Sequence, residues 1–454
     1  MTSISDTPAP QQAAPDSLPF DGSPVLEARI ERPAHGGHFV ARIDGRVVFV
    51  RHALPGETVR VRLTEQDVDA SFWRGDAVEV LEPSPHRVVH PWPLADSLKC
   101  AARHRAPVGG AEFGHIALAE QRRLKGEIFA EQLSRLAGVE QPVEVEAVPA
   151  ESPDGLGWRT RTAFAVTASG RLAMHVHRSN DLVPVASMPL AVDAINVLGL
   201  WKIDFSGMDR VDVAAGSGGG VPLVLLVPAA GTPARRPAAI AAQLKGASVA
   251  VLDVESGRVQ RITGRTWLQE RVGDSDYRVT GAGFWQIHRG APSVLVDAVL
   301  AGLQVAPGEK VADLYAGAGL FTVPLAAAVG GGGSVLSVEG SAGTSKDARR
   351  NLHGQDHVSI VEGRVDTVLD SWEGPLDVVL LDPPRAGAGK RVVAQLAEAK
   401  PRAVGYVSCD PASFARDLGL FLARGWSLDQ LRVFDLYPHT HHMESFAVLS
   451  PPAG

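Results

Sequence analysis

Two residues near the end of the chain, Cys409 and Glu444, are of the types that nucleophilic catalysis needs. Cys409 follows the apolar run AVGYVS and precedes Asp410-Pro411, so it stands between an expected strand and an expected helix. A helix N-terminus lowers the pKa of a thiol and favours the thiolate, although a lone cysteine is more often a small buried hydrophobe. If Glu444 lies beside it, the pair would act as nucleophile and general base.

Three histidines, His439, His441 and His442, come just before Glu444 and are the alternative bases. Histidines next to a glutamate also suggest a metal site. The H-E-x-x-H spacing is missing, however, and no companion group of ligands stands elsewhere in the sequence. We therefore expect no metal here.

A second group of residues could hold an adenosine. The run DLYAGAG ends in Gly317 and Gly319, which permit a tight turn and close approach of a ligand to the backbone. Thr322 stands where a G-x-G-x-x-G dinucleotide fingerprint has its third glycine. Glu339 ends the next expected strand, where a carboxylate can accept hydrogen bonds from both ribose hydroxyls. An ordinary strand-to-helix turn is the alternative.

The run DVVLLD ends in Asp382-Pro-Pro-Arg385. Two consecutive prolines make an extended, rigid loop without N–H donors, so the loop presents its carbonyls and the Asp382 carboxylate without flexing. A simple turn is the alternative interpretation.

The elements that carry these residues alternate from about residue 281 onwards: strand, turn, helix, repeated. This order predicts a mostly parallel, doubly wound, Rossmann-like α/β sheet with helices on both faces. Ligands of such sheets bind beyond the carboxyl ends of the strands, and the residues above all follow strands.

The rest of the chain divides by composition into three parts. Residues 1–23 are rich in Pro, Ala, Gln and Ser and are expected to be a disordered tail. Residues 24–85 hold short alternating runs between turn signals, which predict a small all-β barrel of the oligonucleotide-binding type. Residues 86–280 are mixed and predict a central α/β domain, which includes a polar helix that ends at Gly138. Residues 281–454 form the Rossmann-like domain.

The totals limit the class of protein. The 454 residues are 45% hydrophobic, enough for a large core, and the net charge of -7 is no nucleic-acid signature, although one basic face would suffice for binding. Only two cysteines, Cys100 and Cys409, are present, so a reducing compartment fits best. Without a signal peptide or a long apolar run, the sequence predicts a cytoplasmic protein that binds no membrane.

The motifs DLYAGAGLF, VEG, LLDPPRAG, YVSCDP and HTHHMESFAVL, in this order, resemble the RNA 5-methyluridine methyltransferases. The upstream segment GFWQIH is similar to the Phe-x-Gln segment of that family, and GGHFVARIDGRVVFVRHALPGETVRV resembles a TRAM domain, an RNA-binding barrel. The region between them matches more loosely, through QRRLK and GWRTRT.

This resemblance implies an enzyme that transfers a methyl group from S-adenosylmethionine to carbon 5 of a uridine in RNA. It implies that Cys409 attacks C6 of the uracil and that Glu444 removes the C5 proton. The positions that would bind the methyl donor are Gln286, Tyr315, Glu339 and Asp382.

The sequence also departs from the family. Many members carry four cysteines that ligate an iron–sulfur cluster, but their C-G-G-C segment reads Val108-Gly-Gly-Ala111 here, another ligand position is Met188, and the first is either Trp92 or Cys100. At most one ligand remains, so no cluster is expected. An Asn of the glycine loop is replaced by Leu320, and the last residue of the Phe-x-Gln segment is His288.

Three rival functions stay open at this point. A base amino-methyltransferase would place an aromatic residue where Arg385 stands. A nicotinamide oxidoreductase would need the missing third glycine. A non-catalytic RNA-binding protein would need neither Cys409 nor Glu444. The appended barrel favours 23S ribosomal RNA over transfer RNA by analogy with the family. We expect a monomer.

Overall fold

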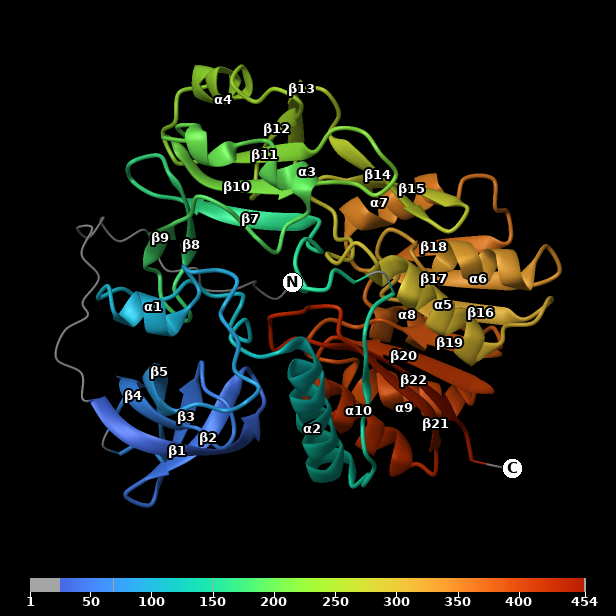
Figure 1. The fold of residues 1–454 in the computed structure, drawn as a ribbon. Helices are drawn as coiled ribbons and strands as arrows, with labels where there is room; N and C mark the ends of the chain where they lie inside the picture. Colours follow the sequence, from blue (N-terminus) through green and yellow to red (C-terminus); the bar gives the residue numbers. More distant parts are fainter. Residues whose placement is uncertain (1–24, 68, 150, 453–454) are drawn as a thin grey trace.

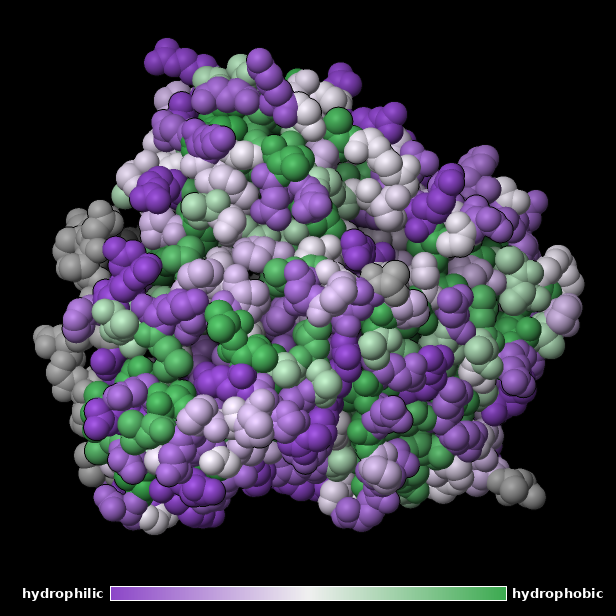
Figure 2. Space-filling model, in the orientation of Figure 1, coloured by the Kyte–Doolittle hydropathy of each residue, from purple (hydrophilic) through white to green (hydrophobic). Residues whose placement is uncertain are grey.

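The computed structural model describes residues 25–67, 69–149 and 151–452. The expected tail, residues 1–23, lies outside them. In the described part, no helix combines the length and apolar character that crossing a membrane requires. Hydrophilic side chains cover most of the face in Figure 2, with hydrophobic residues in scattered patches.

The N-terminal strands close into a barrel in the order β1-β2-β3-β5-β4. Alternation explains their burial: in β4, Val59, Val61 and Leu63 point inward while the arginines between them do not. The small barrel expected from the sequence is therefore confirmed. Its strands are β1 (Val25–Ala34), β2 (His38–Ile43), β3 (Arg46–Arg51), β4 (Thr58–Glu65) and β5 (Phe72–Glu82).

A second sheet of seven strands follows, in the order β13-β12-β11-β10-β7-β8-β9, and lies above the barrel in Figure 1. Its strands are β7 (Arg161–Val166), β8 (Leu172–His175), β9 (Leu182–Pro184), β10 (Met208–Ala214), β11 (Leu223–Pro228), β12 (Ser248–Leu252) and β13 (Val259–Thr263). The short elements around it are α1 (Ser97–Ala101), α3 (Asp193–Asn196), η1 (Leu200–Lys202), α4 (Arg235–Ala241) and the hairpin of β14 (Trp267–Val272) and β15 (Ser275–Thr280).

The third sheet has eight strands in the order β18-β17-β16-β19-β20-β22-β21-β6. The strands from β18 to β20 are parallel, and β22 runs antiparallel between β20 and β21. This is the mostly parallel, Rossmann-like sheet that the alternation predicted. Its strands are β16 (Lys310–Leu314), β17 (Ser334–Glu339), β18 (Val358–Glu362), β19 (Val378–Leu381), β20 (Ala403–Ser408), β21 (Ser427–Phe434), β22 (Glu444–Ser450) and β6 (Val145–Glu146). The helices are α5 (Ala291–Leu303), α6 (Thr322–Val329), α7 (Ala342–Asn351), α8 (Val365–Ser371), α9 (Gly389–Ala399) and α10 (Pro411–Leu422).

Helix α2 (Leu118–Ala137) comes from the expected central region but packs against α10, where Phe129 and Phe414 lie 5.8 Å apart (Figure 1). It ends as the sequence predicts, because Gly138 adopts a left-handed conformation and its N–H bonds to the carbonyls of Leu133 and Ser134. The helix thereby lies beside the C-terminal part of the eight-stranded sheet.

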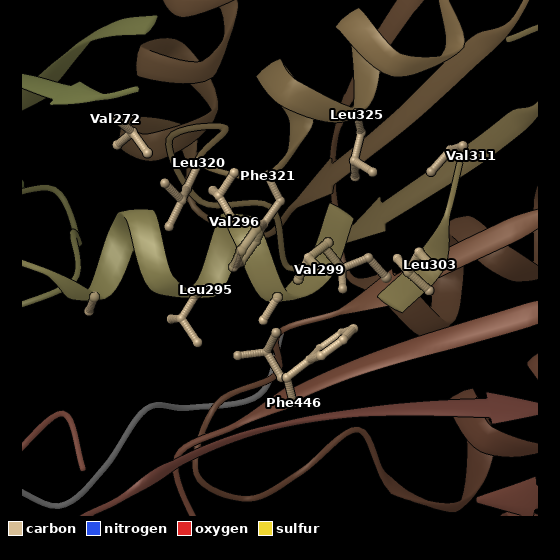
Figure 3. Close-up of a cluster of buried hydrophobic side chains, with 14 of the residues drawn as sticks. Val272, Leu295, Val296, Val299, Leu303, Val311, Leu320, Phe321, Leu325 and Phe446 are labelled. Carbon is tan, nitrogen blue, oxygen red and sulfur yellow. The ribbon is translucent and has the colours of Figure 1, made fainter. Parts of the chain in front are cut away.

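Helix α5 supports β22 from one face of this sheet. Its side chains Leu295, Val299 and Leu303 belong to a buried cluster with Phe321 and Phe446 (Figure 3). Phe446 is the third residue of β22, so this cluster anchors the strand two residues after Glu444.

Candidate active site

Cys409 and Glu444 meet across two neighbouring strands. β20 and β22 pair Ser408 with Ser445, so Cys409, one residue after β20, stands opposite Glu444, the first residue of β22. Glu444 is buried and accepts a hydrogen bond from the Tyr437 hydroxyl at 3.0 Å. Sequence reasoning did not name Tyr437, because nothing in the local pattern distinguishes it from a core tyrosine.

The electrostatics at Cys409 differ from the expectation. Burial, and then the carboxyl groups of Glu444 and Asp382, raise the pKa of the Cys409 thiol to about 12, whereas the Arg385 guanidinium opposes them. The prediction that a helix N-terminus would lower this pKa is wrong in the free protein, because desolvation and nearby acids outweigh the helix dipole. Burial, and then Asp382, also raise the pKa of Glu444 well above its ordinary value.

Glu339 lies over the glycine turn that follows β16. Its two carboxylate oxygens accept hydrogen bonds from the Gly317 N–H at 2.9 Å and the Ser341 N–H at 2.6 Å. Gly317 has φ 57° with open space where a Cβ would point, and Tyr315, half-buried, has φ 66°. The turn therefore leaves room for a ligand beside its backbone.

Two further acids stand at the same edge of the sheet. Burial, and then Asp313, raise the pKa of Asp382 to about 7. The pKa of Asp313 is also raised to about 7, mainly by burial, although Thr322 donates a hydrogen bond to it. Among the described residues, Asp313 Oδ1 is buried without a hydrogen-bond partner. Sequence reasoning did not select Asp313, although an acid inside the apolar run KVADLY is a signal that could have found it.

Gln286 is buried where the central sheet meets the C-terminal domain. The segment around it runs beside GWRTRT: the Thr160 N–H donates to the Ile287 carbonyl at 2.7 Å, and the Arg289 N–H donates to the Trp158 carbonyl at 2.9 Å. His288 stacks on Trp158, with ring centroids 5.6 Å apart. The GFWQIH and GWRTRT segments of the sequence are therefore neighbours in space. Beside them, Arg159, Arg161 and Arg210 line a cavity of about 280 Å³.

Helix α2 holds the segment that leads to Glu444. The Lys125 ammonium, fully buried, lies 2.5 Å from Asp435 Oδ1 and donates to the Tyr437 carbonyl at 3.2 Å. Gln121 accepts a hydrogen bond from the His439 N–H at 2.8 Å. The QRRLK motif thus positions the loop between β21 and β22, a role that its sequence did not suggest.

The three histidines of this loop have structural contacts. His439 Nε2 lies 2.7 Å from the Asp154 carbonyl, and the ring and N–H of His441 both bond to the half-buried Glu112. Burial, and then His441, lower the pKa of His442 to about 3. No group of three or more His, Cys, Asp or Glu residues among those described could hold a metal ion.

Comparison with known proteins identifies the family. Residues 24–70 match the TRAM domain, and residues 363–451 match the family described as tRNA (Uracil-5-)-methyltransferase. The chain is 42% identical to an uncharacterized RNA methyltransferase of Streptomyces avermitilis over 94% of this chain and 98% of that protein. It is 30% identical to the 23S rRNA (uracil(1939)-C(5))-methyltransferase RlmD of a Shewanella species, over 91% of this chain and 93% of that protein. The chain belongs to the RNA uracil-C5 methyltransferase family. It is an S-adenosylmethionine-dependent enzyme.

A solved structure has the same fold. The Pyrococcus abyssi tRNA (uracil-54, C5)-methyltransferase, in complex with S-adenosyl-L-homocysteine, superposes with a TM-score of 0.68 at 23% sequence identity. The match covers 93% of this chain and 99% of that chain.

The acidic edge of the methyltransferase sheet fits S-adenosylmethionine. The donor carries a sulfonium and an ammonium group. Glu339 bonds to the open glycine turn, and the carboxyl groups of Asp313 and Asp382 stand at the same edge of the sheet. Asp313 Oδ1, buried without a partner among the described residues, is an acceptor that such a ligand could satisfy. Bringing positive charge to this edge would also favour the ionised form of these acids.

The barrel of the methyltransferase touches the loop after β20 and the loop before β22 through the turn between β1 and β2. His35 Nε2 lies 3.2 Å from a carboxylate oxygen of Asp410, the residue after Cys409. A Cβ at Gly37 would lie 3.0 Å from the His441 ring and 3.2 Å from the Glu112 side chain. The turn is therefore in close contact with the loops that carry Cys409 and Glu444.

The positions that the resemblance assigns to cluster cysteines lie mostly in an apolar core. Trp92, Val108, Ala111 and Met188 belong to one buried hydrophobic cluster. Cys100 is buried in α1, and its thiol donates to the Leu94 carbonyl at 3.4 Å. Burial raises the pKa of the Cys100 thiol to about 11.

Proposed function

We propose that this enzyme methylates carbon 5 of a specific uridine in 23S ribosomal RNA through a covalent bond between Cys409 and C6 of that uracil. The observation that carries the mechanism is the register of β20 and β22, which sets Cys409 opposite Glu444. Two findings support 23S ribosomal RNA as the target: the relative named as a 23S rRNA methyltransferase, which matches over most of its length, and the TRAM barrel.

The chemistry explains why these residue types are needed. Uracil C5 is a weak nucleophile, and addition of the Cys409 thiolate to C6 creates an enolate with electron density at C5. S-adenosylmethionine supplies the electrophilic methyl group and leaves as S-adenosylhomocysteine. The Glu444 carboxylate then takes the C5 proton, the electron pair of that C–H bond restores the C5–C6 double bond, and the C6–S bond breaks to release the thiolate.

The raised pKa of Cys409 implies a control over its reactivity. Burial, and then the acids Glu444 and Asp382, hold the thiol protonated, whereas Arg385 favours the thiolate. Gln286, Tyr315, Glu339 and Asp382 are proposed to bind the methyl donor. Positive charge beside Asp382 would offset the field of that acid and lower the pKa of Cys409. The thiol would then become reactive only in the complex with the donor.

The mechanism is tested by comparing Glu444→Gln with Cys409→Ala. Gln is close in size to Glu but cannot take a proton at neutral pH, so Glu444→Gln is expected to stop after methylation, with protein and RNA joined. The adduct should survive denaturing electrophoresis and should require both S-adenosylmethionine and Cys409. Cys409→Ala should lose activity and keep its affinity for the donor. Unchanged turnover by Glu444→Gln, without an adduct, would exclude Glu444 as the base, and His442 would be the next candidate.

The target is tested by mapping 5-methyluridine in ribosomal and transfer RNA from a strain that lacks the gene. We expect one site of 23S ribosomal RNA to lose its methyl group and to regain it on incubation with the purified enzyme. Loss of a methyl group from transfer RNA alone would refute the ribosomal assignment. Methylation of an exocyclic amine would refute the chemistry.

A further inference from the structure

A second basic cavity lies on the barrel, and none of the residues proposed for catalysis or donor binding lines it. It has a volume of about 370 Å³ and is enclosed by one side of the barrel, by residues 105–107 and by the segment 176–181. Figure 1 shows α1 and β8, which include or adjoin the lining residues Ser97 and Val176, next to the barrel. Its lining includes His38, Arg51, Arg74, Arg105, His177 and Arg178.

The charge of the cavity favours an anion. Its lining holds five arginines, Arg51, Arg62, Arg74, Arg105 and Arg178, and three acids, Glu65, Asp76 and Asp181. Arg51 is oriented by Asp76, to which it donates two hydrogen bonds at 2.8 and 2.7 Å. Arg178, with about half of its side chain exposed, lies 3.6 Å from Glu65, and Arg105 is exposed. These two guanidinium groups can turn towards a phosphate with little rearrangement.

Two neutral histidines complete the cavity. The rings of His38 and His177 lie 6.2 Å apart, edge to face. Among the described residues, His177 Nε2 is buried without a hydrogen-bond partner. Burial, followed by the charge of Arg51, lowers the pKa of each to about 4, so both rings are neutral at pH 7. A neutral imidazole offers one donor, one acceptor and a flat face, which are the groups that recognise an unstacked base.

We propose that this cavity binds one unpaired nucleotide of the substrate RNA, at a distance along the strand from the uridine that is methylated. The phosphate would lie against Arg105 and Arg178, and the base would lie against His38 and His177. The volume is in the range of small-ligand sites and admits one nucleotide but not a duplex. The inference rests on the proposed RNA substrate and adds a site at which a particular RNA can be selected.

The first test measures RNA binding and turnover with Arg105→Ala/Arg178→Ala in the full chain. The matched control is Arg42→Ala, an exposed barrel arginine outside the cavity. In the double variant, we expect KM for the RNA to rise roughly tenfold, while kcat and the affinity for S-adenosylmethionine stay unchanged. A plot of the logarithm of the RNA-binding constant against the logarithm of the salt concentration should become less steep, by about 0.7 for each lost contact with a phosphate of a single strand. A KM and a salt slope equal to those of the control would overturn the proposal.

The second test separates a nucleotide site from a site for phosphate alone. The protein is labelled at the histidine rings, and inorganic phosphate and each of the four nucleoside monophosphates are titrated separately while the ring signals of His38 and His177 are followed. The monophosphates should shift both signals at lower concentrations than phosphate does, and His177→Ala should remove that advantage. Equal shifts by phosphate and by every monophosphate would overturn the base-binding part.

Failure of this inference can be told apart from failure of the proposed function. Binding is measured on transcripts of both 23S ribosomal RNA and transfer RNA, whether or not they become methylated. If the unmutated enzyme binds neither RNA, the proposed function fails. If it binds RNA and the double variant binds equally well, only the nucleotide cavity is refuted.

Discussion

Replacing Lys125 with Met tests how the loop before Glu444 is held. Both Lys125 and Asp435 are fully buried, with 2.5 Å between them, so the substitution leaves a carboxylate in the core without its main partner. Removing one member of a buried pair costs about 3–5 kcal/mol, and we expect the lower end, about 3 kcal/mol, because Arg122 remains 3.4 Å from Asp435. That is roughly a hundredfold in the ratio of folded to unfolded protein. Since Lys125 also bonds to the Tyr437 carbonyl, kcat should fall as well.

Thermal unfolding measures the effect, and the melting temperature should fall by about 6 °C or more, at roughly 2 °C per kcal/mol. Lys125→Met/Asp435→Leu should recover much of the loss, because the unpaired charge is gone. The exposed pair of Arg271 and Asp276, 2.9 Å apart, gives the control: Arg271→Met should leave the melting temperature nearly unchanged, because water screens an exposed pair. If Lys125→Met melts like this control, or if the double variant is no more stable than the single one, the pair does not hold the loop.

Three further outcomes are expected. Gly37→Ala and Gly45→Ala both strain a left-handed residue, by about 1 kcal/mol. Only Gly37→Ala should also lower kcat, because only its Cβ meets His441 in the loop before Glu444, and equal kcat values would refute the contact. Affinity for S-adenosylmethionine, measured by calorimetry, should rise about tenfold from pH 6 to pH 8, because the pKa of Asp382 is about 7 and its ionised form binds the cation. The rise should flatten in Asp382→Asn. An unchanged rise in that variant would assign the pH dependence to another group. Protein purified without oxygen should contain no stoichiometric iron or acid-labile sulfide, and finding both would contradict the argument from the missing cysteines.

Local patterns predicted the architecture well. Apolar runs bounded by Gly and Pro are distinct from amphipathic helices, so the doubly wound sheet and the barrel follow from the order of these runs along the chain. The same reasoning located Glu339 and Asp382, because functional residues of such a sheet follow the carboxyl ends of its strands. Those residues do end β17 and follow β19.

The electrostatics could not be derived in this way. Position before a helix suggested a reactive thiolate at Cys409, whereas burial and two acids reverse the direction of its pKa shift. Glu444 is 35 positions further along the chain, and the pairing of β22 with β20 decides that it faces the thiol. A pKa depends on every charge and every shell of water around the group, so it is a property of the packed site.

The sequence by itself therefore determined the fold class, the family and the types of group available for chemistry, because each of these depends on short-range patterns of polarity and on motifs in order. Only the tertiary structure decided which contacts hold the site residues in place and which charged groups surround them. Lys125 supports a loop 310 residues away, and segments far apart in the sequence enclose the basic cavity beside the barrel. Such contacts form only when separate elements pack, and packing depends on the shapes of whole surfaces, which no local pattern encodes.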